Sequence, residues 1–130
     1  MMKYRKRMST AMFAAVMCGI LSFSACDLSA GASPEAPSAA QDAINYYFGN
    51  IADQATRVAE CESGMDPNAV SSGGGNWGLF QINTVHRDEF EAVTGRPWSD
   101  VTDPYANAAY AVRLYNESGG WGPWACRSAA

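Results

Sequence analysis

The pattern of hydrophobic and polar positions is clearest between residues 51 and 62, where four apolar side chains recur at helical spacing. They share one face of a helix with 3.6 residues per turn, and they are Ile51, Ala55, Val58 and Ala59. Asn50 is a suitable N-cap, and Gly64 can adopt the left-handed conformation that ends many helices. We therefore expect a helix from residue 51 to residue 62.

A brief apolar run and the residues that start or stop helices predict three further helices, which cover residues 43–48, 84–94 and 104–117. The last has the clearest start, because Asp103 can cap it and Pro104 suits its first turn. Between residues 70 and 83 the pattern alternates weakly around three consecutive glycines, which favours a small hairpin or an extended loop. The chain therefore predicts an α+β fold that is mainly α, with a minor β-hairpin.

The N-terminal segment, residues 1–26, has the three parts of a secretory signal. Four cationic side chains between Lys3 and Arg7 precede an apolar run from Ala11 to Phe23, and small residues follow. The apolar run is about 13 residues long, which is short of the ~20 that a membrane-spanning helix needs. We expect an exported protein, with a permanent N-terminal anchor as the less favoured alternative.

Phe23-Ser24-Ala25-Cys26 resembles the site at which lipoprotein signal peptidase cuts, before a cysteine that receives a lipid. Leucine usually stands where this chain has Phe23. A second small-residue cleavage site lies at Ala30-Gly31-Ala32. The mature protein is therefore expected either to be anchored to the membrane through Cys26, facing the cell wall, or to be freely secreted.

Residues 27–42 are rich in Ser, Ala, Gly and Pro, which is typical of a flexible linker, so the folded domain is expected to cover residues 43–130. A domain this small benefits from a covalent cross-link. Its two cysteines, Cys61 and Cys126, are expected to form a disulfide in an oxidising compartment. Two cysteines and one histidine are too few for a structural zinc site, so no metal is expected.

Composition and charge exclude one class of function. Hydrophobic residues make up 48% of the 130 residues and charged residues 17%, which is typical of a single globular domain. Beyond the first seven residues no lysine remains, and five arginines face thirteen acidic side chains. Because such a surface repels phosphate backbones, we do not expect nucleic-acid binding.

One carboxylate falls on the apolar face of the helix predicted over residues 51–62. Glu62 follows Ile51 by eleven residues, and eleven steps of 100° return almost to the same direction. Burial and the negative end of the helix dipole both favour the protonated side chain, which can then give its proton to a leaving oxygen. Considered alone, the position also fits an ordinary polar helix end.

Three segments carry a family resemblance. They are Ala59-Glu60-Cys61-Glu62-Ser63-Gly64, Pro67-Asn68-Ala69-Val70-Ser71 and Gly78-Leu79-Phe80-Gln81-Ile82-Asn83. Their order and spacing resemble the lysozyme-like soluble lytic transglycosylases, in which a Glu-Ser pair ends a helix and a Gly-Leu-(Met/Phe)-Gln segment lines the glycan cleft. The end of the domain, Gly120 to Cys126, is similar to resuscitation-promoting factor domains, which also carry Cys-Glu-Ser-Gly and a cysteine pair.

The resemblance implies a small lysozyme-like domain with Glu62 as its catalytic acid and base. It implies that Ser63 and Gln81 contact the sugar and that Asn83, in the same segment as Gln81, contributes to substrate binding. Tyr115 is the nearest match to the tyrosine that the family places late in its catalytic site, although the usual Ala-Tyr-Asn-x-Gly string is not intact.

Tryptophans support a glycan cleft independently, because sugar rings stack on indole faces. Trp77 is the best candidate, since it borders glycine-rich backbone that a ligand can approach closely. Trp98 and Trp124 are expected to pack in the core. His86 lies early in a predicted helix with no nucleophile or metal-ligand set nearby, so a solvated or structural role is expected.

The segment 76–83 also resembles the hairpin of animal-type lysozymes, which place an aspartate where this chain has Asn76. An amide is neither a nucleophile toward an anomeric carbon nor a base for water, so the second carboxylate of ordinary glycosidases is missing at this position. Asp66 and Asp100 are other acids that could approach the cleft, but nothing in the sequence places them there.

The prediction is therefore a monomeric lytic transglycosylase without a cofactor that acts on peptidoglycan glycan strands. It would cleave the β-1,4 bond between N-acetylmuramic acid and N-acetylglucosamine and leave 1,6-anhydromuramic acid. A hydrolytic muramidase and a non-catalytic peptidoglycan-binding module remain as alternatives.

Overall fold

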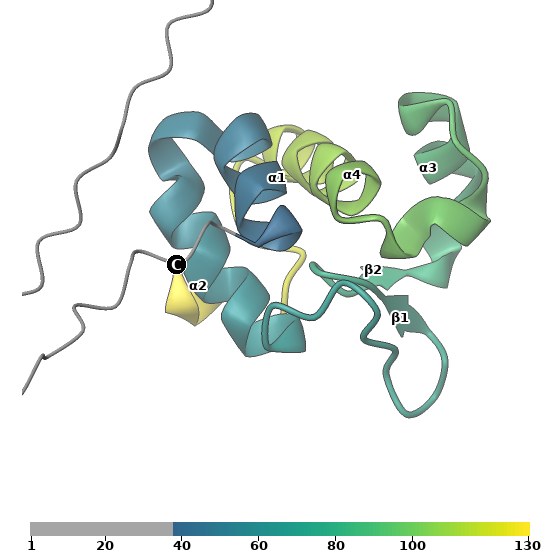
Figure 1. Ribbon diagram of the computed structural model, residues 1–130, viewed down its shortest axis with the longest axis horizontal. Coiled ribbons are helices and arrows are strands. Elements are labelled where there is room, and N and C mark those ends of the chain that lie inside the picture. The colour runs from purple at the N-terminus through teal and green to yellow at the C-terminus, as the bar shows by residue number, and fades with distance from the viewer. Residues whose placement is uncertain (1–37) are drawn as a thin grey trace, which may run out of the picture. The chain divides into compact units, whose positions relative to one another are not determined.

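The computed structural model describes residues 38–130, so the expected signal segment, most of the expected linker and Cys26 lie outside the described residues. In the described part, four α-helices and several short 3-10 helices accompany a two-stranded hairpin (Figure 1). This arrangement confirms the prediction of a mainly helical fold with a minor β-hairpin. None of the helices within residues 38–130 combines the length and the hydrophobicity of a membrane-spanning segment.

The first helix, α1, runs from Ala39 to Phe48 and so begins four residues before the predicted start at residue 43. Ser38 caps it, because its hydroxyl oxygen accepts a hydrogen bond of 3.2 Å from the Gln41 N–H. Ala40 is buried and joins the core. Composition assigned these residues to a linker, but a capping serine followed by two alanines starts the helix.

The second helix, α2, covers Ala52–Ser63 and matches the predicted range within one residue. Its predicted apolar face is confirmed, since Ala55, Val58 and Ala59 are fully buried. Gly64 ends it in the left-handed conformation, with a φ of 65°. The prediction that Asn50 caps this helix is wrong, because a 3-10 helix, η1 (Gly49–Ile51), leads directly into α2.

The hairpin pairs β1 (Asn76–Trp77) with β2 (Ile82–Asn83), and Asn76 lies opposite Asn83. The turn between the strands, residues 78–81, points Leu79 and Phe80 into the core, where both are fully buried. The glycine-rich run before β1 forms a separate loop, closed by a bridge between Val70 and Trp77. An apolar turn of this kind places the hairpin against the helices.

The fourth helix, α4 (Pro104–Ser118), presents a buried amide to that turn. Asn107 accepts a hydrogen bond of 2.8 Å from the Phe80 N–H and donates to the carbonyl oxygens of Val101 (2.7 Å) and Trp77 (3.1 Å). It is the one polar residue among 38–130 that is fully buried. All three hydrogen bonds are to backbone groups. Asn107 therefore fixes the path of the backbone through the turn rather than the orientation of a single side chain.

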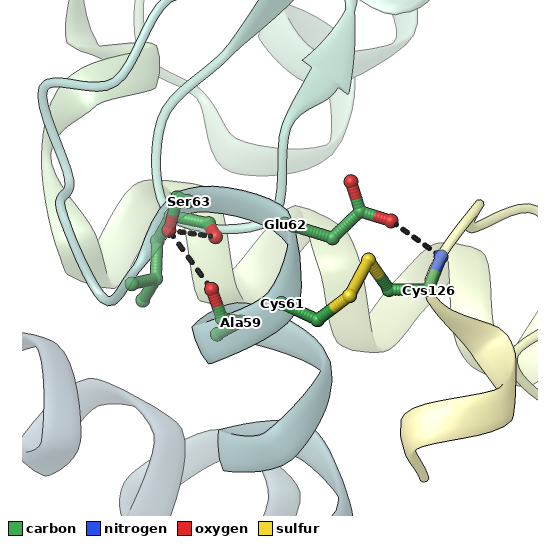
Figure 2. Close-up of a disulfide and its surroundings, with 6 residues drawn as sticks. Ala59, Cys61, Glu62, Ser63 and Cys126 are labelled. Carbon is green, nitrogen blue, oxygen red and sulfur yellow. Dashed lines mark hydrogen bonds between the residues drawn. A yellow bond between two sulfur atoms is a disulfide. The ribbon is translucent and has the colours of Figure 1, made fainter.

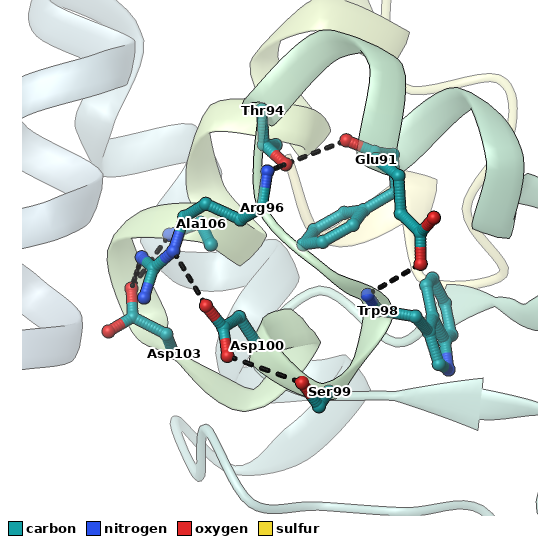
Figure 3. A network of polar contacts seen from close by, with 9 residues as sticks. Glu91, Thr94, Arg96, Trp98, Ser99, Asp100, Asp103 and Ala106 are labelled. Carbon is teal, nitrogen blue, oxygen red and sulfur yellow. Dashed lines mark hydrogen bonds and ion pairs between the residues drawn. The ribbon is translucent and has the colours of Figure 1, made fainter.

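Between the hairpin and α4 lie η2 (Thr84–His86), α3 (Arg87–Thr94) and η3 (Trp98–Thr102). Arg96 contacts Asp100 and Asp103, each at 2.9 Å (Figure 3). Partial burial opposes ionisation of Asp103, but hydrogen bonds from the Ala106 N–H and Arg96 outweigh it and hold the pKa of Asp103 below its ordinary value. The capping role predicted for Asp103 is thus confirmed.

The core lies where α1 packs against both α2 and α4. Phe48 stacks on Trp121, with ring centroids 5.5 Å apart, and both rings contact Phe80 from the hairpin turn. Trp98 and Trp124 are buried, as predicted. The C-terminal 3-10 helix, η4 (Arg127–Ala129), packs against α2, which brings the end of the domain next to the end of that helix.

Candidate functional site

Two adjacent hollows, of about 160 and 170 Å³, lie between the end of α2, the hairpin and the C-terminal segment. They share four lining residues, which are Asn76, Gln81, Pro123 and Trp124. Glu62 and Ala125 complete the first hollow, whereas Ile82, Asn83, His86 and Leu114 complete the second. We call the two together the cleft; it brings together the predicted site residues Glu62, Gln81 and Asn83.

Glu62 lies in the last turn of α2 and is half-buried. One carboxylate oxygen, Oε1, accepts a hydrogen bond of 2.9 Å from the Cys126 N–H, while the other points away from Cys126 (Figure 2). Within the described part of the chain, Glu62 is the only carboxylate that lines the cleft. Any acid or base chemistry by a carboxylate in this cleft therefore belongs to Glu62.

Gln81 lines both hollows from an unusual backbone conformation, with a φ of 48° that non-glycine residues seldom adopt. Its side-chain Nε2 donates to the carbonyl oxygens of Gly78 (3.0 Å) and Ala69 (3.2 Å). These contacts occupy the amide N–H groups and leave Oε1 as an acceptor. Such a conformation costs energy and is common at ligand sites, so its position supports a functional role.

Asn76 and Asn83 face each other across the hairpin, and the Asn83 Nδ2 donates to the Asn76 Oδ1 at 2.8 Å. The Oδ1 of Asn83 accepts from the Val85 N–H at 3.0 Å and thereby caps η2. Asn83 is thus held by both of its polar ends. The Nδ2 of Asn76 remains as a donor beside both hollows.

Ser63 follows Glu62 in the chain but does not line either hollow. Its hydroxyl oxygen lies 2.8 Å from the carbonyl oxygen of Leu79 and 3.0 Å from that of Ala59 (Figure 2). The hydroxyl therefore joins the end of α2 to the hairpin turn. A contact between Ser63 and substrate remains a prediction.

Two other predicted site residues also lie outside the lining of the cleft. The Trp77 indole N–H donates to the Gly74 carbonyl oxygen at 2.9 Å, and the side chain is half-buried. Tyr115 packs against Trp121, with ring centroids 4.7 Å apart, and also contacts Phe48. For both residues, substrate binding remains a prediction.

Sequence reasoning missed the contribution of the C-terminal segment to the cleft. Trp124 was expected only in the core, and it is 4% exposed with its indole N–H donating to the Phe80 carbonyl oxygen at 3.0 Å. It nevertheless lines both hollows beside Pro123. The one available signal was the run Gly120-Trp121-Gly122-Pro123-Trp124, which is dense in residues that shape a rigid turn.

His86 is the other ionisable residue that lines the described cleft, and it belongs to the second hollow, whereas Glu62 belongs to the first. Its Nδ1 lies 3.7 Å from a carboxylate oxygen of Glu89, and that oxygen also accepts a hydrogen bond of 2.8 Å from the Tyr110 hydroxyl. Burial, followed by the Glu89 contact, raises the pKa of Tyr110 well above its ordinary value. Tyr110 therefore stays protonated and serves as a structural donor.

The disulfide predicted between Cys61 and Cys126 is confirmed, and it closes a loop of 65 residues. It lies beside the Glu62 carboxylate and brings the C-terminal segment to the cleft (Figure 2). Among residues 38–130 no group of three or more His, Cys, Asp or Glu side chains is arranged to hold a metal ion.

Comparison with known proteins gave one match. A family model described as a lysozyme-like domain matches residues 42–126, a range that includes every residue lining the cleft and both cysteines of the disulfide. No curated protein and no solved structure matches the chain. The likeness of the C-terminal run to resuscitation-promoting factor domains has no support from these comparisons.

Proposed function

This chain belongs to the family of lysozyme-like domains, and we propose that it is an exported lytic transglycosylase of peptidoglycan. It cleaves the β-1,4 bond between N-acetylmuramic acid and N-acetylglucosamine. One observation carries the choice of reaction, namely that Glu62 is the only carboxylate lining the described cleft. One carboxylate can act first as an acid and then as a base, but it leaves no second group to attack the sugar or to activate water.

In the first step Glu62 donates the proton on its free oxygen to the glycosidic oxygen. The bond from that oxygen to the anomeric carbon of the muramic acid breaks, and its electron pair leaves with the N-acetylglucosamine unit. Positive charge develops on the anomeric carbon, where the substrate's own 2-acetamido oxygen can stabilise it. The Cys126 N–H on Oε1 stabilises the negative charge that Glu62 acquires as it loses its proton.

In the second step the 6-hydroxyl of the same muramic acid attacks the anomeric carbon and closes a 1,6-anhydro ring. The Glu62 carboxylate accepts the hydroxyl proton and returns to its starting form, so no atoms are gained or lost by the enzyme. The attack benefits from the high effective concentration of a tethered nucleophile. Gln81 Oε1 and Asn76 Nδ2 supply one acceptor and one donor that can orient the acetamido group in the cleft.

The reaction products distinguish this proposal from its alternatives. Mass spectrometry of digested glycan strands is expected to show muropeptides ending in 1,6-anhydromuramic acid, about 18 Da lighter than hydrolysed ones, because no water is added at the cut. Reducing-end muramic acid carrying ¹⁸O from solvent would instead identify a hydrolytic muramidase. Binding to the strands without turnover would identify a peptidoglycan-binding module.

We also propose that the enzyme acts outside the cytoplasm, held to the membrane by a lipid on Cys26. The Cys61–Cys126 disulfide supports an oxidising compartment. Replacing Cys26 with Ala is expected to release activity from the membrane fraction or to leave an uncleaved precursor, because the lipid attachment point is lost. Fractionation with N-terminal sequencing measures this, and a mature protein that begins near Ser33 would show that the enzyme is freely secreted.

A further inference from the structure

We propose that the Cys61–Cys126 disulfide is a positioning device for the catalytic acid. It holds the Cys126 N–H on Oε1 of Glu62, so that cleavage depends on an intact bridge. The inference rests on the proposed role of Glu62. It adds that the rate of the chemical step responds to the oxidation state of two cysteines, neither of which lines the cleft.

The contacts close a ring of atoms that includes the Glu62 side chain. Cys61 precedes Glu62 directly in α2, and its sulfur is bonded to that of Cys126. The backbone N–H of the same Cys126 donates to Oε1 of Glu62 at 2.9 Å (Figure 2). Two adjacent residues of α2 thus contact one residue near the end of the domain, through a covalent bond and a hydrogen bond.

Besides the bridge and the contact with Glu62, the hydrogen bonds around Cys126 are backbone bonds within the C-terminal turn. The Ala129 N–H donates to the Cys126 carbonyl oxygen at 2.9 Å and the Arg127 N–H to the Trp124 carbonyl oxygen at 3.4 Å, and neither bond joins Cys126 to α2. On one side Trp124 is buried and hydrogen-bonded to the Phe80 carbonyl oxygen, but Ala125 between them is exposed. On the other side the Ala129 carbonyl oxygen accepts a hydrogen bond of 2.9 Å from Arg57, at an exposed position. Opening the bridge therefore leaves Trp124 in its place in the lining of the cleft, while Cys126 loses its covalent bond to α2 and can move away from Glu62.

Loss of this N–H affects the chemical step more than substrate binding. The donor on Oε1 assigns the transferable proton to the other oxygen and stabilises the carboxylate formed in the transition state. A hydrogen bond to a charged group is worth a rate change of roughly 10- to 100-fold. The side chains of Gln81 and Asn83 are held by hydrogen bonds to groups other than Cys126, so they keep their contacts and KM changes little.

The bridge is accessible to a reductant, since Cys61 is exposed and Cys126 is half-buried. A small dithiol such as dithiothreitol can open it. One thiolate attacks a bridge sulfur and displaces the other as a thiolate, and the second thiol then closes a cyclic disulfide on the reagent. The protein gains two electrons and two protons and ends with two free thiols.

The test compares kcat and KM on soluble glycan strands for the oxidised exported protein and for the Cys61→Ser/Cys126→Ser double variant. The variant is expected to lose roughly 10- to 100-fold in kcat with KM within about threefold. Dithiothreitol should lower kcat of the parent to the same level, reoxidation should restore it, and the double variant should not respond. Arg57→Ala, which loosens the C-terminus at Ala129 but leaves the bridge, is the matched control and should keep the parental kcat.

Each kcat is divided by the folded fraction, measured from tryptophan fluorescence at the assay temperature, so that partial unfolding of the variant does not imitate the effect. The inference is overturned if the folded double variant keeps kcat within a factor of two of the parent, or if KM rather than kcat changes. An oxidised parent without any turnover would contradict the proposed function instead, and the two failures are therefore distinguishable.

Discussion

Replacing Glu62 with Gln is expected to abolish strand cleavage and to leave the domain folded. The amide is nearly isosteric, and its oxygen can still accept the Cys126 N–H, so the end of α2 keeps its contacts. It cannot donate a proton to the glycosidic oxygen or take one from the 6-hydroxyl. General acid catalysis is typically worth ~10²–10⁴-fold, and here one group serves both steps. We expect a fall of at least about 10³-fold in the release of anhydromuropeptides.

Glu60 supplies the matched control for this substitution. It lies two residues earlier in α2, is exposed, and does not line the cleft. Glu60→Gln removes the same charge from the same helix and is expected to keep parental activity within about twofold, since surface substitutions away from a site rarely matter. If Glu62→Gln retained activity within a few-fold of the parent while binding the strands equally well, Glu62 would not be the catalytic acid.

The fold was predictable where local signals decide it. The range of α2 follows from apolar periodicity and from Gly64 as a C-cap, and that of α4 from Asp103 as an N-cap and Pro104 in the first turn, all of which act within a few residues. The start of α1 was missed because the composition of residues 27–42 indicated a linker, although Ser38 in that segment is the N-cap of the helix. The burial of Leu79 and Phe80 within a turn was also missed, because it depends on an amide in α4.

The site was predictable in part, for a related reason. Glu62 and Gln81 belong to short motifs, and the structure brings both to the cleft. The Cys126 N–H is a backbone group and has no signature in the sequence. Its partner Glu62 lies 64 residues earlier in the sequence, and the hydrogen bond from the Trp124 indole to the Phe80 carbonyl oxygen spans 44 residues. Such contacts depend on tertiary packing, which no local pattern describes.

The prediction with the largest effect on stability concerns the amide that supports the hairpin turn. Asn107→Ala is expected to destabilise the domain by ~2–6 kcal/mol, because two buried backbone groups, on Phe80 and Val101, lose their partner at a cost of ~1–3 kcal/mol each, and the partly buried carbonyl of Trp77 loses a donor as well. Domains of this size have total stabilities of only about 5–15 kcal/mol. Urea unfolding followed by tryptophan fluorescence measures the change.

Asn116 is the control, since it lies on the same helix, is exposed, and its side chain makes no hydrogen bond within residues 38–130. Asn116→Ala is expected to change the free energy of unfolding by less than about 0.5 kcal/mol. A similar value for Asn107→Ala would mean that water or local rearrangement satisfies the three backbone groups, and that the turn does not depend on this side chain.

A double-mutant cycle with Gly78 tests the same contact from the other side. Gly78 has a φ of 76°, and a Cβ there would collide with the Asn107 Nδ2 and lie 2.7 Å from the Val101 carbonyl oxygen. Gly78→Ala alone is therefore expected to destabilise the domain through both backbone strain and the collision. Truncating Asn107 removes one of the two collisions, so the double variant should lose less stability than the sum of the single variants, with a coupling of ~0.5–3 kcal/mol. Additive losses would show that Asn107 does not pack against the turn at Gly78.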